Sequence, residues 1–200
     1  GGIERIGKTT EKIVPTMVIL YVSASLFIIF TNFDKLPGVI NAIFSEAFTP
    51  SATYGGIMGV IVMGIKRAVF SNEGGVGSAS IAHSAAKTDE PVREGIVAMI
   101  GPFIDTIVIC FMTASVILIT ADQNPLINQT GIQGAQLTSA AFGSAISWFP
   151  IVLSIVVFLF SYSTMISWYY YGEKGWKYLS ASSSSLIIYK TLFLACVLVG

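Results

Sequence analysis

The sequence has 200 residues, of which 54% are hydrophobic and only 11% are charged, and its formal net charge is zero. Ordinary soluble domains carry about a quarter charged residues, so this composition excludes a largely water-exposed surface and predicts an integral membrane protein. The charges balance and form no dense basic patch, which argues against nucleic acid as a partner.

Long uncharged runs alternate with short charged clusters along the chain. A helix needs roughly 20 apolar residues to cross a bilayer, and most of these runs are long enough. We expect an all-α integral membrane domain over residues 1–200, with about five spans near residues 14–31, 50–70, 95–120, 140–171 and 186–200. The chain starts without methionine and stops inside an apolar run, so we interpret it as a fragment of a larger transmembrane domain.

Two segments differ from a simple span. Apolar residues at positions 36, 39, 40, 43 and 44 recur with the helical period, which predicts a short amphipathic helix lying at a membrane face. The uncharged run over residues 138–171 would be about 50 Å long as one helix, whereas the bilayer core is about 30 Å thick. We therefore expect this run to tilt, to kink near Pro150 or to protrude from the membrane.

Basic residues predict the orientation of the spans, because cytoplasmic loops hold the excess of lysine and arginine. With alternating helices, every basic residue except Lys35 falls on one side. We assign the start of the chain and the loop 71–93 to the cytoplasm, and the protein to the cell membrane of a prokaryote as a multi-pass protein. A helix should start at Pro91, because proline is favoured at the first position of a helix.

The second uncharged run is rich in glycine, at Gly55, Gly56, Gly59 and Gly64. Small residues at this spacing let two membrane helices approach closely. They also permit a helix that is broken at mid-membrane, where backbone carbonyls and amides become available to a solute. The residues alone leave both interpretations open.

The polar stretch over residues 71–91 contains glycines, acids and the single histidine of the chain. Its glycines lack the spacing of a phosphate-binding loop, and His83 has no neighbouring histidine or cysteine with which to hold a metal. No nucleophile, base and acid converge, so we do not expect an enzyme. We expect His83 to have a structural or gating role, and Glu73 to cap a helix or to pair with the preceding cations.

Asp105 is the only carboxylate well inside a predicted span, about 15 Å from its start and near the membrane midplane. An ionisable group at that depth is costly and usually faces the protein interior, which makes it a functional candidate. It would either carry a proton or serve as a structural carboxylate bonded to Thr106, Thr113 or a neighbouring helix. Both roles stay open.

A cluster of hydroxyl side chains lies in the cytoplasmic half of the run over residues 138–171. Ser163 and Thr164 are adjacent, and their oxygens, together with freed backbone carbonyls, are ligands that a sodium ion accepts. Trp168 lies one turn beyond Thr164 and shares its face. Hydroxyls in membrane helices also bond back to their own backbone, so the residues alone do not decide between a cation site and a local structural role.

Four short runs of the sequence resemble a known protein family. They are residues 70–79 (FSNEGGVGSA), 81–89 (IAHSAAKTD), 103–106 (FIDT) and 160–174 (FSYSTMISWYYYGEK). Together they resemble the alanine or glycine:cation symporter family, the sodium:alanine symporters, over the whole chain. The resemblance implies a LeuT-type fold, in which inverted helical repeats surround a site at the midplane, and sodium-driven uptake of a small neutral amino acid through the lipid bilayer.

The resemblance also implies roles for single residues. Ser163 and Thr164 match the hydroxyl pair of a sodium site, Trp168 looks like the aromatic wall of the substrate pocket, and the glycine run 55–64 looks like the broken helix that lines it. Sodium is then the coupling ion, and no other metal or cofactor is implied. The first core helix, which would complete both sites, is absent from the sequence.

Three residues remain as candidates for gating or coupling: Asp105, His83 and Glu73, the last two within a loop that we expect to form part of an inner gate. Two alternative functions stay open. One is a proton-coupled relative that uses Asp105, and the other is a non-transporting membrane subunit or a channel. Replacing a sodium gradient by a pH gradient separates the first from sodium symport, and a failure to bind labelled alanine identifies the second.

Overall fold

The computed structural model describes residues 3–47, 62, 64–73, 75–121, 132, 134–180 and 182–199. These residues form helices and no strand, so the all-α prediction is confirmed. Residues 64–71 are helical. The other elements, in chain order, are α1 (Ile3–Thr31), η1 (Phe33–Lys35), α2 (Leu36–Ala47), α4 (Ser78–His83), α5 (Pro91–Pro102), η2 (Phe103–Ile109), α6 (Cys110–Thr120), α7 (Ala135–Ala145), α8 (Phe149–Leu179) and α9 (Ser183–Val199).

Three helical stretches among the described residues are long and apolar enough to cross a bilayer. They are Glu4–Thr31, Pro91–Thr120 and Phe149–Leu179, and the apolar helix at Ser184–Val199 is shorter. A multi-pass membrane protein is thereby confirmed. Most of the expected span near residues 50–70 lies outside the described residues, and with it Gly55, Gly56 and Gly59.

The starts of two helices follow from their sequences in different ways. α5 begins at Pro91, as predicted, because a proline ring fits the first turn of a helix, where its missing N–H is not needed. α1 begins at Ile3, well before the uncharged run that starts at residue 14. Its first turns include several lysine, arginine and glutamate residues, which have high helix propensity, so this flank continues the helix instead of forming a loop.

The uncharged run over residues 138–171 is divided between two helices. α7 ends at Ala145, Ile146 has an extended backbone, and α8 begins at Phe149 with Pro150 in its first turn. A Cβ at Gly143 would lie only 2.8 Å from Cγ of Pro150. The absence of a side chain at Gly143 therefore lets α7 fold back closely onto the start of α8. The uncharged run therefore does not form one helix, because the chain is broken beside Pro150 into α7 and α8.

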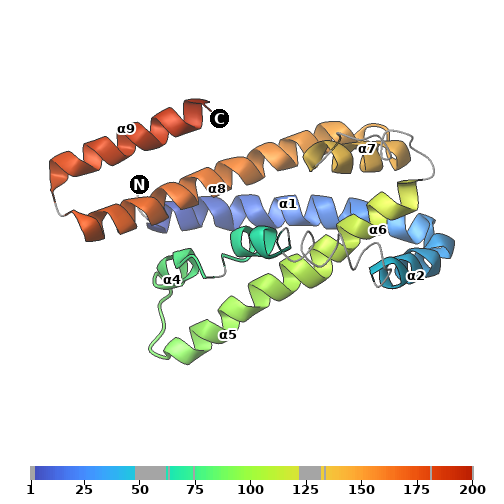
Figure 1. Ribbon diagram of the computed structural model, residues 1–200, viewed down its shortest axis with the longest axis horizontal. Helices are drawn as coiled ribbons and strands as arrows, with labels where there is room; N and C mark the ends of the chain where they lie inside the picture. The colour runs from blue at the N-terminus through green and yellow to red at the C-terminus, as the bar shows by residue number, and fades with distance from the viewer. Residues whose placement is uncertain are drawn as a thin grey trace.

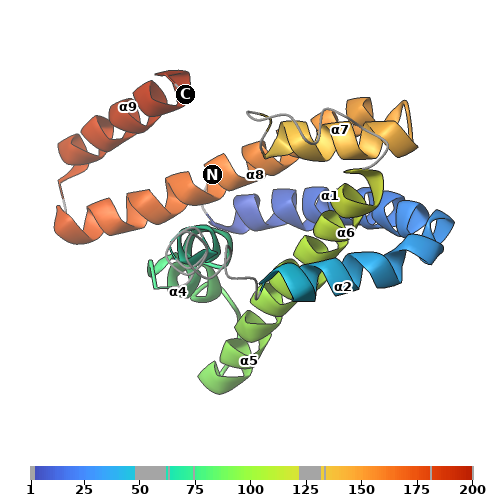
Figure 2. The same cartoon turned by 45° about the vertical axis from the view of Figure 1, so that its right-hand side comes forward.

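The long helices pack side by side. α1 and α8 run antiparallel and contact each other, and the α5, η2 and α6 stretch crosses beside them with α6 against α1 and α7 (Figures 1 and 2). The start of α1, α4, the start of α5 and the end of α8 all lie in the left half of Figure 1. These are the parts that carry most basic residues, so their common end agrees with the expected charge asymmetry. The assignment of that end to the cytoplasm stays a prediction.

The buried core lies at the other end of the bundle, around Phe142 of α7. This side chain is fully buried, and its ring centroid is 5.3 Å from that of Tyr21 in α1 and 5.1 Å from that of Phe149 in α8. The hydroxyl of Tyr21 is 2.6 Å from Thr113 Oγ1 in α6, which ties a fourth helix to the cluster. α2 adds Val39 to the same core, so the predicted helix is present, and Leu36 and Ile43 pack against this core while Phe44 stays exposed.

α9 packs against the last third of α8 through a close approach at Gly172. A Cβ at Gly172 would lie 2.9 Å from Cζ of Tyr189 and nearer still to its hydroxyl oxygen. That hydroxyl donates a hydrogen bond of 2.9 Å to the carbonyl oxygen of Tyr169. A side chain at Gly172 would therefore displace Tyr189 from this bond.

We expect Gly172→Ala to destabilise the protein by about 1–3 kcal/mol, because the added methyl overpacks the α8–α9 contact. Gly175→Ala is the matched control, since a Cβ at Gly175 has no neighbour within 4 Å. Alanine exceeds glycine in helix propensity by up to about 1 kcal/mol, so the control should become slightly more stable. Unfolding in detergent measures both variants, and shifts of the same sign would contradict the packing described for Gly172.

Candidate functional site

The predicted hydroxyl pair lies in the middle of α8. Ser163 is only 6% exposed, and its Oγ donates a 2.8 Å hydrogen bond to the carbonyl oxygen of Phe160. Ser167 Oγ in turn donates to the carbonyl oxygen of Ser163 at 3.0 Å. The hydroxyls of Ser163 and Ser167 thus donate to backbone carbonyls of their own helix. Because a hydroxyl oxygen also has two lone pairs, this donation leaves Ser163 Oγ able to accept a cation.

A cleft of about 260 Å³ opens where α8 faces α1 and the segment after residue 71. We call it the hydroxyl cleft, and its lining residues are Thr10, Val14, Glu73, Ser163, Thr164, Ser167, Trp168 and Tyr171. Three predicted site residues of α8 therefore share one cavity, and a carboxylate distant in sequence joins them. The cleft offers hydroxyl oxygens and one carboxylate, which are the oxygen ligands that hard cations prefer.

Aromatic rings form one side of the hydroxyl cleft. The ring of Trp168 stacks on Phe70, with centroids 5.6 Å apart and an interplanar angle of 12°. Tyr171 meets Trp168 edge to face at 6.1 Å. Phe70 belongs to the helical segment 64–71, which follows the glycine-rich run. This stacking fixes the tryptophan against a neighbouring helix, as a pocket wall requires.

A second cleft of about 330 Å³ lies between the segment 71–73, α4, α5 and η2, and we call it the loop cleft. Its lining includes Glu73, His83, Asp105 and Tyr171. Glu73 and Tyr171 line the hydroxyl cleft as well, so the two cavities are neighbours. Glu73 has a positive φ of 53°, which is uncommon for a residue with a side chain.

Asp105 is bonded to a neighbouring segment. Ser71 Oγ donates a hydrogen bond to Asp105 Oδ2. Beside it, Asn72 and Thr106 exchange two hydrogen bonds, of 3.1 and 3.3 Å. Asp105 and Thr106 both lie in η2, a π-helical stretch within the second long span. The hydrogen-bond partner of Asp105 is thus Ser71, at the end of the neighbouring helical segment 64–71, and both a structural and a coupling role for Asp105 stay predictions.

His83 also has a definite partner. Its Nδ1 is 2.6 Å from Oε1 of Glu94 in the first turn of α5. The bond joins the short helix α4 to the start of the second long span. Among the described residues, no group of three or more histidine, cysteine, aspartate or glutamate side chains could hold a metal ion. His83 thus has the structural partner that the sequence left unnamed.

Comparison with known proteins identifies the family. The model of the sodium:alanine symporter family matches residues 1–200. The chain belongs to this family. The family name describes sodium-coupled transporters and not enzymes.

Several members of the sodium:alanine symporter family are similar in sequence. The sodium/alanine symporter AgcS of Methanococcus maripaludis is 42% identical over 96% of this chain and 42% of its own length. The probable sodium/glutamine symporter GlnT of Bacillus subtilis is 38% identical over 100% of this chain and 41% of its own length. The sodium/proton-dependent alanine carrier protein of Bacillus sp. is 33% identical over 100% of this chain and 48% of its own length. The chain thus spans less than half the length of these symporters.

The sequence alone did not reveal every residue in or beside the hydroxyl cleft. Ser167 and Tyr171 repeat the helical spacing of Ser163 and Trp168 along one face of α8, so their periodicity was a usable signal. Thr10 and Phe70 come from other helices, and no local pattern marks them.

Proposed function

We propose that the full-length protein is a sodium-coupled symporter for a small neutral amino acid, alanine or glycine, which works by alternating access. Membership of the sodium:alanine symporter family supports the class. The single observation that carries the site is the hydroxyl cleft, where Ser163, Thr164 and Trp168 share one cavity with Glu73.

In this proposal the sodium ion binds to the hydroxyl oxygens of Ser163 and Thr164. Both belong to one cleft, and Ser163 Oγ already donates its proton to a backbone carbonyl, so its lone pairs are free to face a cation. The nearby Glu73 carboxylate would offset the charge of the ion. Oxygen ligands of this kind suit a hard cation and do not suit a soft metal.

The amino acid binds beside the ion, against Trp168. The hydroxyl cleft has a volume of about 260 Å³, below the usual range of roughly 300–1,000 Å³ for pockets that take drug-sized ligands. A small substrate is therefore favoured. If sodium and the amino acid occupy neighbouring positions, each raises the affinity for the other by the same factor.

The LeuT-type arrangement is part of this proposal. The glycines Gly55, Gly56 and Gly59 would supply backbone groups to the substrate from a broken helix. The loop 71–93 would form part of an inner gate, with His83 and Glu94 joining α4 to α5. A cysteine introduced by Ser80→Cys reports on this gate, because its cross-linking rate should change when sodium and alanine are added.

Uptake of labelled alanine and glycine by the full-length protein in proteoliposomes tests the function. An inward sodium gradient should drive accumulation, whereas an equal choline gradient should not. Raising the sodium concentration should also lower the amino acid concentration needed for half-maximal uptake. Uptake that is indifferent to sodium would sink the proposal.

Proton coupling is the second candidate function. One relative in the same family is named a sodium/proton-dependent alanine carrier protein, and the loop cleft contains Asp105 and His83. In this alternative Asp105 carries the proton, and a pH gradient replaces the sodium gradient as the driving force.

We expect Asp105→Asn to keep sodium-driven uptake within about twofold of the unmodified protein, because an amide oxygen still accepts the hydrogen bond from Ser71. The measurement compares uptake driven by sodium with uptake driven by a pH gradient. Loss of a pH-driven component in this variant alone would favour the proton-coupled alternative. Glu90→Gln is the control, because Glu90 pairs with Arg93 at the exposed start of α5.

A further inference from the structure

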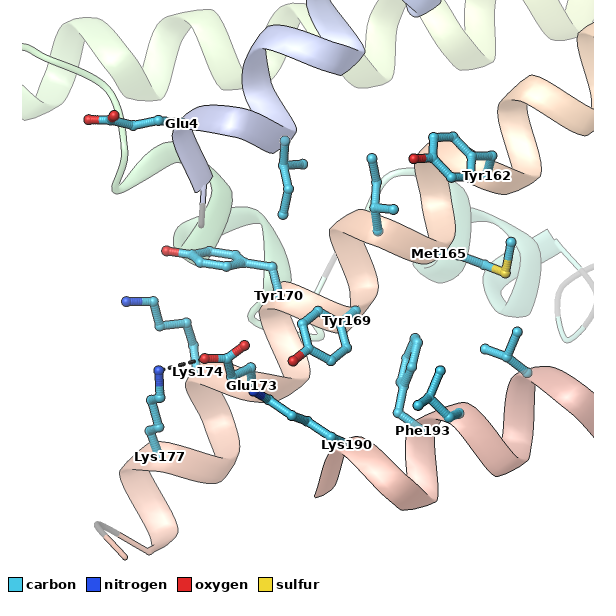
Figure 3. Close-up of a pocket in the computed structure, with 14 residues that line it drawn as sticks. Glu4, Tyr162, Met165, Tyr169, Tyr170, Glu173, Lys174, Lys177, Lys190 and Phe193 are labelled. Carbon is cyan, nitrogen blue, oxygen red and sulfur yellow. Dashed lines mark hydrogen bonds and ion pairs between the residues drawn. The ribbon is translucent and has the colours of Figure 1, made fainter. Parts of the chain in front are cut away.

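A third cleft, of about 960 Å³, lies on the opposite side of α8 from the hydroxyl cleft, between α8, α9 and the start of α1 (Figure 3). We call it the lysine cleft. Lys174, Lys177 and Lys190 line one end of it, and apolar side chains such as Met165, Phe193 and Leu194 line the rest. The cleft therefore combines a basic mouth with an apolar trench.

The α8–α9 side of the mouth holds three lysines and one carboxylate, Glu173. Lys177 Nζ pairs with Glu173 Oε1 at 2.5 Å, and Lys190 also interacts electrostatically with Glu173. Lys174 Nζ lies 5.3 Å above the ring of Tyr170. Glu4 reaches the cleft from α1 and lies across it from Lys177 and Lys190 (Figure 3). The α8–α9 side of the mouth is thus net positive.

The trench has the depth of one bilayer leaflet. It follows α8 from Lys174 to Tyr162, which corresponds to about 18 Å of helix. Half of a hydrocarbon core is about 15 Å thick. Leu194 is 61% exposed and Val197 is 43% exposed, so apolar surface in the trench is not covered by the described residues.

Hydrogen bonds between α8 and α9 hold the walls of the lysine cleft in place. Trp176 Nε1 donates a 2.6 Å hydrogen bond to Ser185 Oγ across the turn. Tyr189 donates to the carbonyl oxygen of Tyr169, and the two rings pack with centroids 5.8 Å apart. A ligand would find this cleft already formed, and its binding would not require ordering of the two helices.

We propose that the lysine cleft binds one anionic glycerophospholipid of the surrounding bilayer. Its phosphate lies between Lys174 and Lys190, and an acyl chain fills the trench beside Phe193 and Leu194. Basic pockets between membrane helices on the cytoplasmic side attract anionic headgroups, and the charge asymmetry of the chain assigns this end to that side. The charge complementarity selects a lipid over an apolar helix from the rest of the full-length protein, because such a helix would bury three lysines beside only two carboxylates, Glu4 and Glu173.

Native mass spectrometry of the full-length protein, released from nanodiscs of mixed phosphatidylglycerol and phosphatidylcholine, tests the proposal. The unmodified protein should retain phosphatidylglycerol in preference to phosphatidylcholine. The double variant Lys174→Gln with Lys190→Gln should bind phosphatidylglycerol about thirtyfold more weakly, since each lysine near the headgroup contributes to the attraction. Lys8→Gln with Lys87→Gln removes the same charge away from the lysine cleft and should have no such effect.

A second variant tests the contribution of the apolar trench to lipid binding separately from that of the lysine charges. Leu194→Trp narrows the apolar part, keeps every lysine and should also reduce retention of phosphatidylglycerol. Equal retention of both lipids by the unmodified protein, or equal losses in the two lysine pairs, would overturn the proposal. A trench covered by another helix of the full-length protein would produce the first of these results. Lipid retention is measured without transport, so this proposal and the proposed symport fail independently.

Discussion

Sodium-dependent alanine uptake should become much weaker in Ser163→Ala combined with Thr164→Ala, because both hydroxyl oxygens then leave the hydroxyl cleft. The sodium concentration for half-maximal uptake should rise at least about tenfold, since disturbing even outer groups around a bound cation typically weakens its binding by that factor. Uptake by proteoliposomes at a series of sodium concentrations measures the change in the full-length protein.

Ser154→Ala is the matched control for that experiment. Ser154 also lies in α8, and its Oγ donates a 2.8 Å hydrogen bond to the carbonyl oxygen of Pro150, as Ser163 does to Phe160. It does not line the hydroxyl cleft. The control removes one intrahelical hydroxyl bond and no proposed ligand, so its sodium dependence should not change. An unchanged sodium requirement in the double variant would exclude Ser163 and Thr164 as ligands.

The second large effect concerns stability. Phe142→Ala should lower the free energy of unfolding by about 3 kcal/mol, near the lower end of the range for Phe→Ala changes in protein cores. Phe142 is fully buried between Tyr21 and Phe149, so the change leaves a cavity where three helices meet. We expect a loss near the lower end of this range because lipid hydrocarbon also solvates apolar groups. In a membrane, most of the loss in free energy of unfolding therefore comes from lost packing contacts.

Phe158→Ala provides the comparison, because Phe158 lies on the neighbouring helix α8 and is 70% exposed. The change removes the same atoms from an exposed site, so its free energy of unfolding should change by no more than an ordinary surface substitution, about 0.5 kcal/mol. Unfolding in mild detergent, followed by the fluorescence of the tryptophans, measures both variants. Equal losses would show that Phe142 does not hold the helices together.

α8 connects the two proposals, because its two faces line different clefts. Thr164, Trp168 and Tyr171 follow the helical period along the hydroxyl cleft, whereas Tyr162, Tyr169 and their neighbours follow it along the lysine cleft. A lipid bound on one face would therefore contact the same helix that we propose to hold sodium on the other.

The sequence by itself determined the class of this protein and several helix limits. The low charge content required a membrane environment, because charged surfaces are what water-soluble folds need. Pro91 marked the start of α5, because the stereochemistry of a proline ring acts locally. The runs around Glu73 and Ser163 were sufficient to indicate the family, which the match over residues 1–200 confirms.

Pro150 marked one possible place for a kink in the long uncharged run, but only the tertiary structure decided that the chain breaks there and which residues meet. Nothing in the charge pattern marked the turn at residues 146–148, because lipid and protein interior select the same apolar side chains there. For the same reason α8, apolar on nearly all sides, does not reveal which face lines a cleft. Thr10 of α1 and Glu73, which follows the helical segment 64–71, line the same cleft as Ser163 because separate parts of the chain pack together, and Asp105 meets Ser71 in the same way. Such contacts depend on helix positions, which no local sequence pattern encodes.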